Sequence, residues 1–298
     1  MAAGEREFSG VVDAATPNVT IGVTRHSLAP GVQQIVESNS GDVDPTFIAN
    51  MLVSPLLSLT TRQMTVLSSF GIAGAAIATA DIWYQQKVEN GLRNATSKKL
   101  TIATGYGAPR TVTASINTPA ELAIDMFAKS SDGTTVPIAA GTGTMAANPT
   151  PVIHTIGPMK INGTEYQADT FSIDFGLQVV VDTSSGFLYP TIIYVLRRAP
   201  TITFTFKDVD ARIAIGIEGL QQSATDSTFY LRKLASGGGR VIDATAEHIK
   251  FTVDDGMFTI NQIEAPHDGE KATYQVTLKP ISDGTAAIIV IDTASAIT

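Results

Sequence analysis

Residues 170–182 read TFSIDFGLQVVVD and carry a strong strand signal. Apolar side chains stand at every second position from Phe171 to Val181. Polar residues occupy alternate positions: Thr170, Ser172, Asp174 and Gln178. Because successive side chains of a strand point to opposite faces of a sheet, this alternation predicts one long strand with one buried and one solvated face.

The residues that follow extend the pattern to further strands. Ser184–Gly186 is a turn signal, and residues 187–197 form a second apolar run in which Pro190 indicates an edge or a bulge. Residues 201–207 alternate again, and residues 208–216, DVDARIAIG, predict a short helix with an aspartate cap and a glycine stop. Later strands are predicted at residues 227–234, 248–253, 257–263, 272–279 and 286–291.

The same pattern occurs earlier in the chain. Residues 37–48, ESNSGDVDPTFI, resemble residues 182–193, DTSSGFLYPTII. Equivalent residues lie 145 positions apart: Gly41 and Gly186, Pro45 and Pro190, Thr46 and Thr191, Pro55 and Pro200, Gly71 and Gly216, Gly74 and Gly219. Since glycine and proline fix backbone geometry, matching them predicts matching turns.

The repeat predicts the fold class and the domain organisation. We expect a mainly β protein made of two tandem β-sandwich or open-barrel domains, each with one short α-helix, that arose by internal duplication. Copy 1 is expected to span residues 1–140 and copy 2 residues 152–298. The small, glycine- and proline-bearing residues 141–151 are expected to form a linker.

Composition narrows the classes of function. The 298 residues carry a net charge of −8, and an acidic chain is a poor candidate for wrapping nucleic acid. With no cysteine, disulfides and thiolate metal sites are impossible. The first residues, MAAGEREF, do not resemble a secretory signal, and no apolar run is long enough to span a bilayer. We therefore expect synthesis in a cytoplasm and no membrane insertion.

No local pattern indicates catalysis. The four histidines, His26, His154, His248 and His267, lack metal-ligand spacing. Asp208 and Asp210 precede the predicted helix, where capping is the simpler role. The segment Gly237–Arg240 is followed by a strand, whereas a phosphate-binding loop is followed by a helix. The expectation is a protein that is not an enzyme, with no catalytic residue, no cofactor and no metal.

The order of these segments resembles the tail tube proteins, or major tail proteins, of tailed bacteriophages. The resemblance rests on the hairpin SIDFGLQVVVDTSSGFLYPTIIYVLRR (172–198), the strand TITFTFKD (201–208) and the helix DVDARIAIG (208–216), a layout seen in both halves. The C-terminal AIIVIDTASAIT (287–298) is also similar to such proteins. The resemblance implies a structural virion protein of the two-tube-domain type, whose homotrimeric rings with pseudo-sixfold symmetry stack into a tube.

The resemblance also implies partners and a location. Each chain would bind its own copies and other tail proteins, and DNA would be only a transient cargo of the lumen. The protein would reside in the virion tail after synthesis in the bacterial cytoplasm.

Two sets of residues are candidates for these roles. The candidates for ring stacking lie in matching hairpin loops: Glu37, Ser40, Gly41, Asp42, Asp44, Asp182, Ser184, Ser185, Gly186 and Phe187. The candidates for the lumen come from the polar parity of two strands: Thr170, Ser172, Asp174, Gln178, Thr273, Gln275 and Thr277.

Other functions stay open at this point. Another virion component, such as a tail terminator, a distal tail protein or a capsid decoration protein, would form a single ring or bind a lattice. A carbohydrate-binding or adhesin module would need export and would favour exposed aromatics, but the chain has a single tryptophan. An enzyme with a spatially assembled site is a further alternative.

Overall fold

The computed structural model describes residues 6–87, 96–161, 163–207, 210, 213, 215, 227–264, 272–282, 284 and 287–298. In this part of the chain the fold is mainly β, with large antiparallel sheets and one short helix. The predicted fold class is confirmed at this level.

The first half of the chain begins with two long strands and a projecting hairpin. In chain order the elements are β1 (Arg6–Ala14), β2 (Val19–Ala29), β3 (Val32–Glu37), β4 (Phe47–Val53), β5 (Leu56–Thr61), η1 (Met64–Val66), α1 (Leu67–Phe70), β6 (Ala75–Ile77), β7 (Ala80–Lys87), β8 (Ser97–Ile102), β9 (Gly105–Ser115), β10 (Glu121–Ala128) and β11 (Ile138–Gly143).

The second half also carries a projecting hairpin, formed by its fourth and fifth strands. Its elements are β12 (His154–Ile161), β13 (Thr164–Tyr166), β14 (Ala168–Asp174), β15 (Leu177–Asp182), β16 (Ile192–Arg198), β17 (Thr201–Phe206), β18 (Ser227–Lys233), β19 (His248–Val253), β20 (Gly256–Glu264), β21 (Thr273–Pro280) and β22 (Val290–Ser295).

One sheet runs through both halves of the chain. Among the described residues its strand order is β11-β8-β7-β1-β2-β5-β10-β9-β14-β17-β21-β20, with β6 beside β9. We call the section from β2 to β20 the main sheet. It is continuous because β9 pairs with β14, from Ser115 beside Thr170 to Thr111 beside Asp174.

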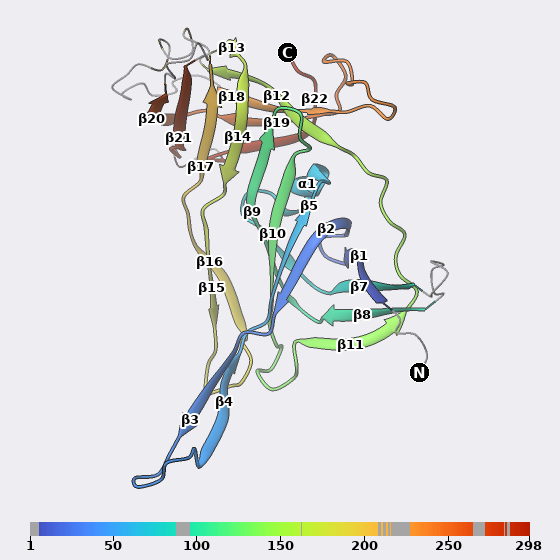
Figure 1. Ribbon diagram of the computed structural model, residues 1–298, viewed down its shortest axis with the longest axis vertical. Helices are drawn as coiled ribbons and strands as arrows, with labels where there is room; N and C mark the ends of the chain where they lie inside the picture. The colour runs from blue at the N-terminus through green and yellow to red at the C-terminus, as the bar shows by residue number, and fades with distance from the viewer. Residues whose placement is uncertain are drawn as a thin grey trace.

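A second sheet covers the main sheet at one end. Its strand order is β13-β12-β18-β19-β22, and these strands run crosswise to β9, β10 and β14 (Figure 1). Strands β7, β8 and β11 of the first half also run crosswise to β9 and β10 (Figure 1). The arrangement corresponds to orthogonal sheet packing, in which the facing sides of both sheets form the core.

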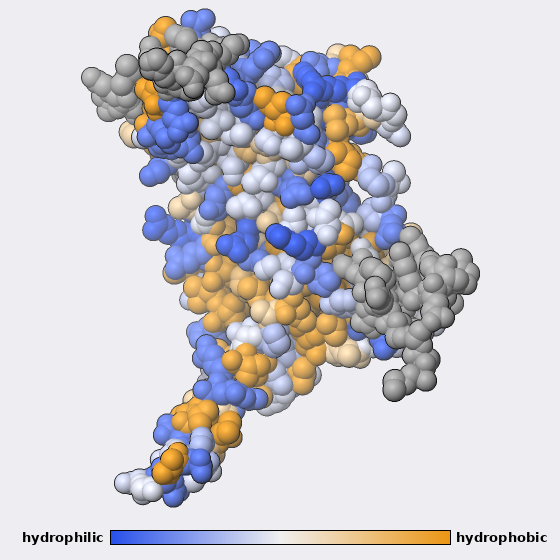
Figure 2. Space-filling view, in the orientation of Figure 1, coloured by the Kyte–Doolittle hydropathy of each residue, from blue (hydrophilic) through white to orange (hydrophobic). Residues whose placement is uncertain are grey.

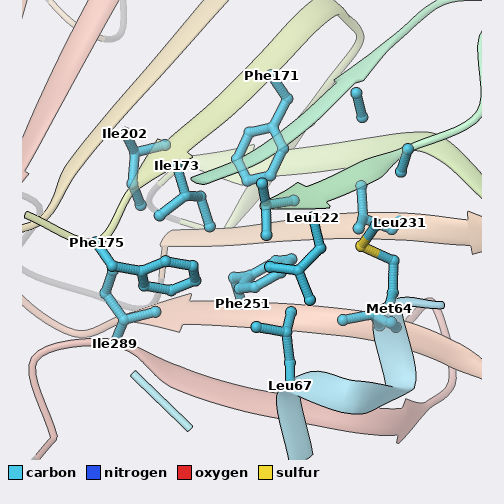
Figure 3. Packing of buried hydrophobic residues seen from close by; sticks show 14 of the residues in the cluster. Met64, Leu67, Leu122, Phe171, Ile173, Phe175, Ile202, Leu231, Phe251 and Ile289 are labelled. Atoms are coloured by element: carbon cyan, nitrogen blue, oxygen red, sulfur yellow. The ribbon is translucent and has the colours of Figure 1, made fainter. Parts of the chain in front are cut away.

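The core is one cluster of buried side chains that includes residues of both halves. Phe171 and Ile173 of β14, and Phe175 directly after it, point toward Phe251 and Leu231 of the second sheet (Figure 3). The rings of Phe171 and Phe229 stack with their centroids 5.2 Å apart. Burying a phenylalanine side chain stabilises a fold by about 1.5–3 kcal/mol, so these contacts hold the two sheets together.

The short helical segment closes the core from the first half. Met64 and Leu67 are buried and point into the cluster that also contains Ile289 from the second half (Figure 3). The helix ends at Gly71, whose φ of +59° suits a residue without a side chain. A helix was predicted for both halves, but most of residues 208–216 lie outside the described residues.

The single strand predicted for residues 170–182 is wrong, because two strands of different sheets share these residues. β14 ends at Asp174, and Gly176 has a φ of +57° and accepts a hydrogen bond from Ala199 N at 3.1 Å. The chain therefore leaves the main sheet, and β15 pairs only with β16 in a separate hairpin. The second predicted strand is shorter than expected, since residues 187–191 form a loop before β16.

Most other predicted elements lie close to their expected positions. The strands predicted at 201–207, 227–234, 248–253, 257–263 and 272–279 correspond to β17, β18, β19, β20 and β21, whereas β22 begins four residues later than predicted. The predicted linker overlaps the end of β11, and the chain between β11 and β12 then runs along one side of the molecule (Figure 1).

The aromatic core gives a first testable prediction. Phe204 is fully buried, with its ring 5.5 Å from Phe229 and 6.3 Å from Phe258 between centroids. Phe204→Ala should lower the free energy of unfolding by about 3–5 kcal/mol, because it leaves a cavity between the sheets. Urea denaturation followed by circular dichroism measures this change. The neighbouring Thr203→Ala, on the solvent side, should cost less than about 0.5 kcal/mol; equal losses would contradict the assignment of the core.

A buried histidine gives a second prediction. His154 on β12 is fully buried, and desolvation lowers its pKa from 6.5 to about 4. Below pH 6.5 the unfolded chain binds a proton that the folded chain does not, so the free energy of unfolding should fall as the pH drops from 6.5 toward 4. The slope from this group should reach about 1.4 kcal/mol per pH unit. The matched variant His154→Phe should lose this part of the slope in urea titrations, and an unchanged slope would contradict the prediction.

Candidate assembly surfaces

Hydroxyl and amide side chains cover the solvent side of the main sheet. We define the polar sheet face as Thr113, Ser115, Thr170, Ser172, Asp174, Thr203, Thr205, Thr273, Gln275 and Thr277. Strand register arranges them in rows: Thr170 lies between Ser115 and Thr205, and Thr205 lies beside Gln275. The hydroxyl oxygens of Thr170 and Thr205 are 2.7 Å apart. The residues between them along each strand are buried. The alternation of polar and apolar residues in the sequence therefore corresponds to the solvent side and the core side of the sheet.

The predicted lumen residues fall into two places. All six candidates on β14 and β21 lie on the polar sheet face. The seventh, Gln178, is on β15 outside the main sheet, where it borders a hollow together with Asp174 and Arg110. The structure therefore brings six of the seven together on one surface.

Two arginines at this surface are paired with carboxylates. Arg62 Nε lies 3.3 Å from Glu121 Oε1, and Arg110 Nη1 lies 3.3 Å from Asp125 Oδ2. Asp125 also accepts a hydrogen bond from Ser58 Oγ at 2.6 Å. Each carboxylate offsets part of the positive charge of the guanidinium group beside it, so the two arginines attract phosphate less strongly than free ones would.

Two hairpins project from the main sheet on the same side of the molecule (Figure 1). Arm 1 consists of residues 30–54, with β3 paired to β4, and arm 2 of residues 176–199, with β15 paired to β16. Each arm is closed at its base by one hydrogen bond. Ser54 N donates to Gly31 O at 3.2 Å, and Ala199 N donates to Gly176 O at 3.1 Å.

The glycine at each base cannot be replaced without strain. Gly31 has a φ of +62°, and a Cβ there would lie 2.2 Å from Ser54 O. Gly176 has a φ of +57°, and its Cβ would lie 2.0 Å from Ala199 O. Both positions combine a left-handed backbone with close approach of another chain segment, for which glycine is the default residue.

The predicted stacking residues lie at the outer ends of the two arms. At each tip one hydrogen bond closes the turn: Asp42 N donates to Asn39 O at 3.0 Å, and Phe187 N donates to Ser184 O at 3.1 Å. The tip of arm 1 is exposed throughout, and Val43 is 97% exposed. The predicted residues of arm 2 share this position at the tip, but Phe187 is half-buried.

The tip of arm 2 is docked on a loop of the first half. Tyr189 N donates to Gly133 O at 3.2 Å, Ser130 N donates to Pro190 O at 2.7 Å, and Val53 N donates to Leu188 O at 2.9 Å. The docking site was not predicted. The glycine at position 133 is a sequence signal for this contact, because any Cβ there would overlap the ring of Phe187.

The loop that receives arm 2 is held in shape by Asp132. Its carboxylate accepts hydrogen bonds from Thr135 N at 2.7 Å and Thr134 N at 2.9 Å, and Ser130 Oγ donates to it at 2.9 Å. These hydrogen bonds, led by that of Thr135, hold the pKa of the Asp132 carboxyl well below its usual range. The loop is therefore preformed for the contact with arm 2.

Both arms present apolar side chains to solvent. The exposed ones on arm 1 are Val32, Val36, Val43, Phe47, Ile48 and Met51, and those on arm 2 are Ile192, Tyr194 and Leu196. Figure 2 shows hydrophobic surface along arm 1 and around the place where the arms join the body. A two-stranded hairpin is marginally stable alone in water, and exposed apolar surface of this kind marks a site of protein contact.

Two of the histidines contact polar groups of other strands. His248 Nδ1 accepts a hydrogen bond from Lys233 N at 3.0 Å, and His26 Nε2 lies 3.0 Å from the hydroxyl of Tyr84. His267 lies outside the described residues. In the described part of the chain no group of three or more His, Asp or Glu residues could hold a metal ion. Helices long and apolar enough to cross a membrane are likewise not found among the described residues.

No protein-family model matches this sequence, and no curated protein is significantly similar to it.

The base of arm 1 provides a third prediction. Gly31→Ala should loosen the arm, because the new Cβ would overlap Ser54 O; a strained residue of this kind costs about 1–3 kcal/mol. The amides of β3 should then exchange with deuterium about tenfold faster or more, as measured by mass spectrometry. Gly41→Ala is the matched control, since φ there is +97° but no described atom lies within 4 Å. Equal exchange in both variants would contradict the proposed constraint at Gly31.

Proposed function

We propose that this chain is a structural virion protein that assembles into stacked rings, and that the rings form a bacteriophage tail tube through which DNA passes. The observation that carries the proposal is the strand order of the main sheet. The first half contributes β2-β5-β10-β9 and the second half β14-β17-β21-β20, each with an arm between its first two strands.

Internal duplication accounts for this repetition. β3, β4 and β5 begin and end 145 positions before β15, β16 and β17. The base glycines Gly31 and Gly176, and the tip glycines Gly41 and Gly186, are separated by the same number and all have positive φ. These matches support two tube-like domains at residues 1–140 and 152–298.

The outer strands of the main sheet suit self-association. In the described residues β20 pairs only with β21, and β2 beyond Gly22 pairs only with β5. Inside the chain, the equivalent strands β9 and β14 pair with each other. A second copy can repeat this pairing by placing its β2 beside β20, and such a head-to-tail contact closes into a ring when the rotation between copies allows.

Closure would place two domains from each of three chains around a pseudo-sixfold axis. The polar sheet face would line the lumen, and the core side of the main sheet would face outward to the second sheet. A hydroxyl-rich surface with paired arginines, in a chain of net charge −8, would let DNA pass without adhering.

The arms would join one ring to the next. Both project on one side of the molecule and carry exposed apolar side chains, among them Phe47 and Tyr194 (Figure 2). The strands of an arm could bury this surface against the adjacent ring, and other tail proteins could bind it at the ends of the tube. The chain would then reside in the virion tail after synthesis in the host cytoplasm.

Negative-stain electron microscopy of the purified chain, with mass photometry in parallel, tests the proposal. We expect six-lobed rings of about 94 kDa, three times the chain mass of 31.3 kDa, and hollow tubes of stacked rings. Rings that never stack would favour a tail terminator or a distal tail protein. Monomers at every concentration up to several milligrams per millilitre would contradict self-assembly and would favour a capsid decoration protein or a carbohydrate-binding module.

A further inference from the structure

The docking of arm 2 is a contact between the two halves of the chain, so it is a template for a contact between chains. Arm 2 leaves the second half beside β14 and reaches the first half through Leu188 and Phe187. Leu188 O accepts a hydrogen bond from Val53 N at the base of arm 1. The ring of Phe187 occupies the space that a side chain at Gly133 would need.

Arm 1 has the same construction but no such contact. Thr46 N donates to Glu37 O at 2.9 Å, as Thr191 N donates to Asp182 O at 3.1 Å 145 positions later. Val43 is the equivalent of Leu188, and it is 97% exposed. The tip of arm 1 is therefore exposed throughout, although the base of the arm contacts arm 2 through Val53.

The second half has a turn at the corresponding place, of which Ser282 and Gly284 are described. Ser282 Oγ accepts a hydrogen bond from Gly284 N at 3.1 Å. Gly284 has a φ of +86°, close to the +79° of Gly133, which lies 151 positions earlier.

We infer that arm 1 of each chain docks laterally on the neighbouring copy, with Val43 at the tip of the arm against Arg198. This inference rests on the proposed ring assembly: it gives the tip of arm 1 a contact within the ring and leaves the joining of rings to the exposed strands of the arms. Arg198 lies 145 positions after Val53, so the pair Val43–Arg198 repeats the pair Leu188–Val53. At the sheet edges, the end of β2 lies 145 positions before the end of β14, and β20 begins 151 positions after β9. The equivalent pairing therefore places Ser27 beside Glu264 of the neighbour and Leu28 beside its Ile263, as Ser172 lies beside Thr113 and Ile173 beside Val112.

The charges of the two junctions differ in a way that supports a second copy as the partner. Inside the chain, Leu188 meets Val53, and both are apolar. Between chains, the tip carries Asp42 and Asp44 and would meet the exposed Arg198. None of these three charged residues forms an ion pair in the described part of the chain. Opposite charges steer association and fix register, whereas the junction formed on folding needs no steering.

Engineered cysteines test the contact, and the natural chain without cysteine gives no background. Chains with Val43→Cys should be mixed with chains carrying Arg198→Cys, assembled and oxidised. We expect a disulfide-linked dimer on a non-reducing gel, and linked trimers when both changes are in one chain. The matched control is Leu188→Cys with Val53→Cys. Val53 N and Leu188 O are 2.9 Å apart, so oxidation should link these two residues within one chain and leave the chain monomeric on the gel.

The outcomes separate this inference from the proposed function. Rings or tubes in the microscope without the Val43–Arg198 disulfide would overturn the lateral docking and leave ring assembly intact. Absence of rings and of the disulfide, while the control pair is oxidised, would overturn both. Linked trimers inside rings would support both.

Charge reversal gives a second readout that does not depend on oxidation. Arg198→Glu should raise the concentration needed for ring formation about tenfold or more in low salt, as measured by mass photometry. Adding Asp42→Lys and Asp44→Lys to that variant should restore assembly, and high salt should weaken the natural contact. Arg240→Glu, which alters an exposed arginine outside the junction, is the control. Equal effects of Arg198→Glu and Arg240→Glu would overturn the inferred contact.

Discussion

The pairing of β9 with β14 joins the two halves of the chain. These strands are central in the main sheet and come from different halves of the chain, so the halves share one hydrogen-bonded layer and one core. If they separated, each would expose a long strand edge, which proteins either protect or use for association. The pairing also fixes the distance over which arm 2 reaches the loop at Ser130 and Gly133. The polar sheet face, the core and the docked arm therefore all follow from the same register.

The sequence predicted the strands well wherever alternation is set by burial. Residues 201–207 and 272–279 alternate because one side faces Phe229 and its neighbours and the other faces solvent. The same rule failed after Phe175, because the apolar residues of β15 continue the alternation although the strand has left the core. Their side chains are only partly buried on a projecting hairpin. Periodicity reports a two-sided environment, and it does not say which sheet supplies it.

The candidate surfaces could be predicted in part for a similar reason. The lumen candidates that were chosen by parity on β14 and β21 lie on one face because both strands pair with β17. Gln178 lies elsewhere because the chain leaves the main sheet at Gly176. The docking of arm 2 could not be found this way, because Phe187 and Gly133 are far apart in sequence and belong to different halves. The sequence signal is limited to glycines, which stand where the backbone has a positive φ or where another chain segment packs against it.

The connection between β11 and β12 has a kinetic consequence. About ten residues, which span at most about 35 Å when extended, tie the two halves together along one side of the molecule. One junction of each pair thus forms at the high effective concentration of a tethered partner, and only the other depends on diffusion. A ring of three such chains would need two associations between chains before it closes, where six separate single-domain subunits would need five. Each covalent tether removes one loss of translational and rotational freedom from closure, so rings should nucleate at lower protein concentration.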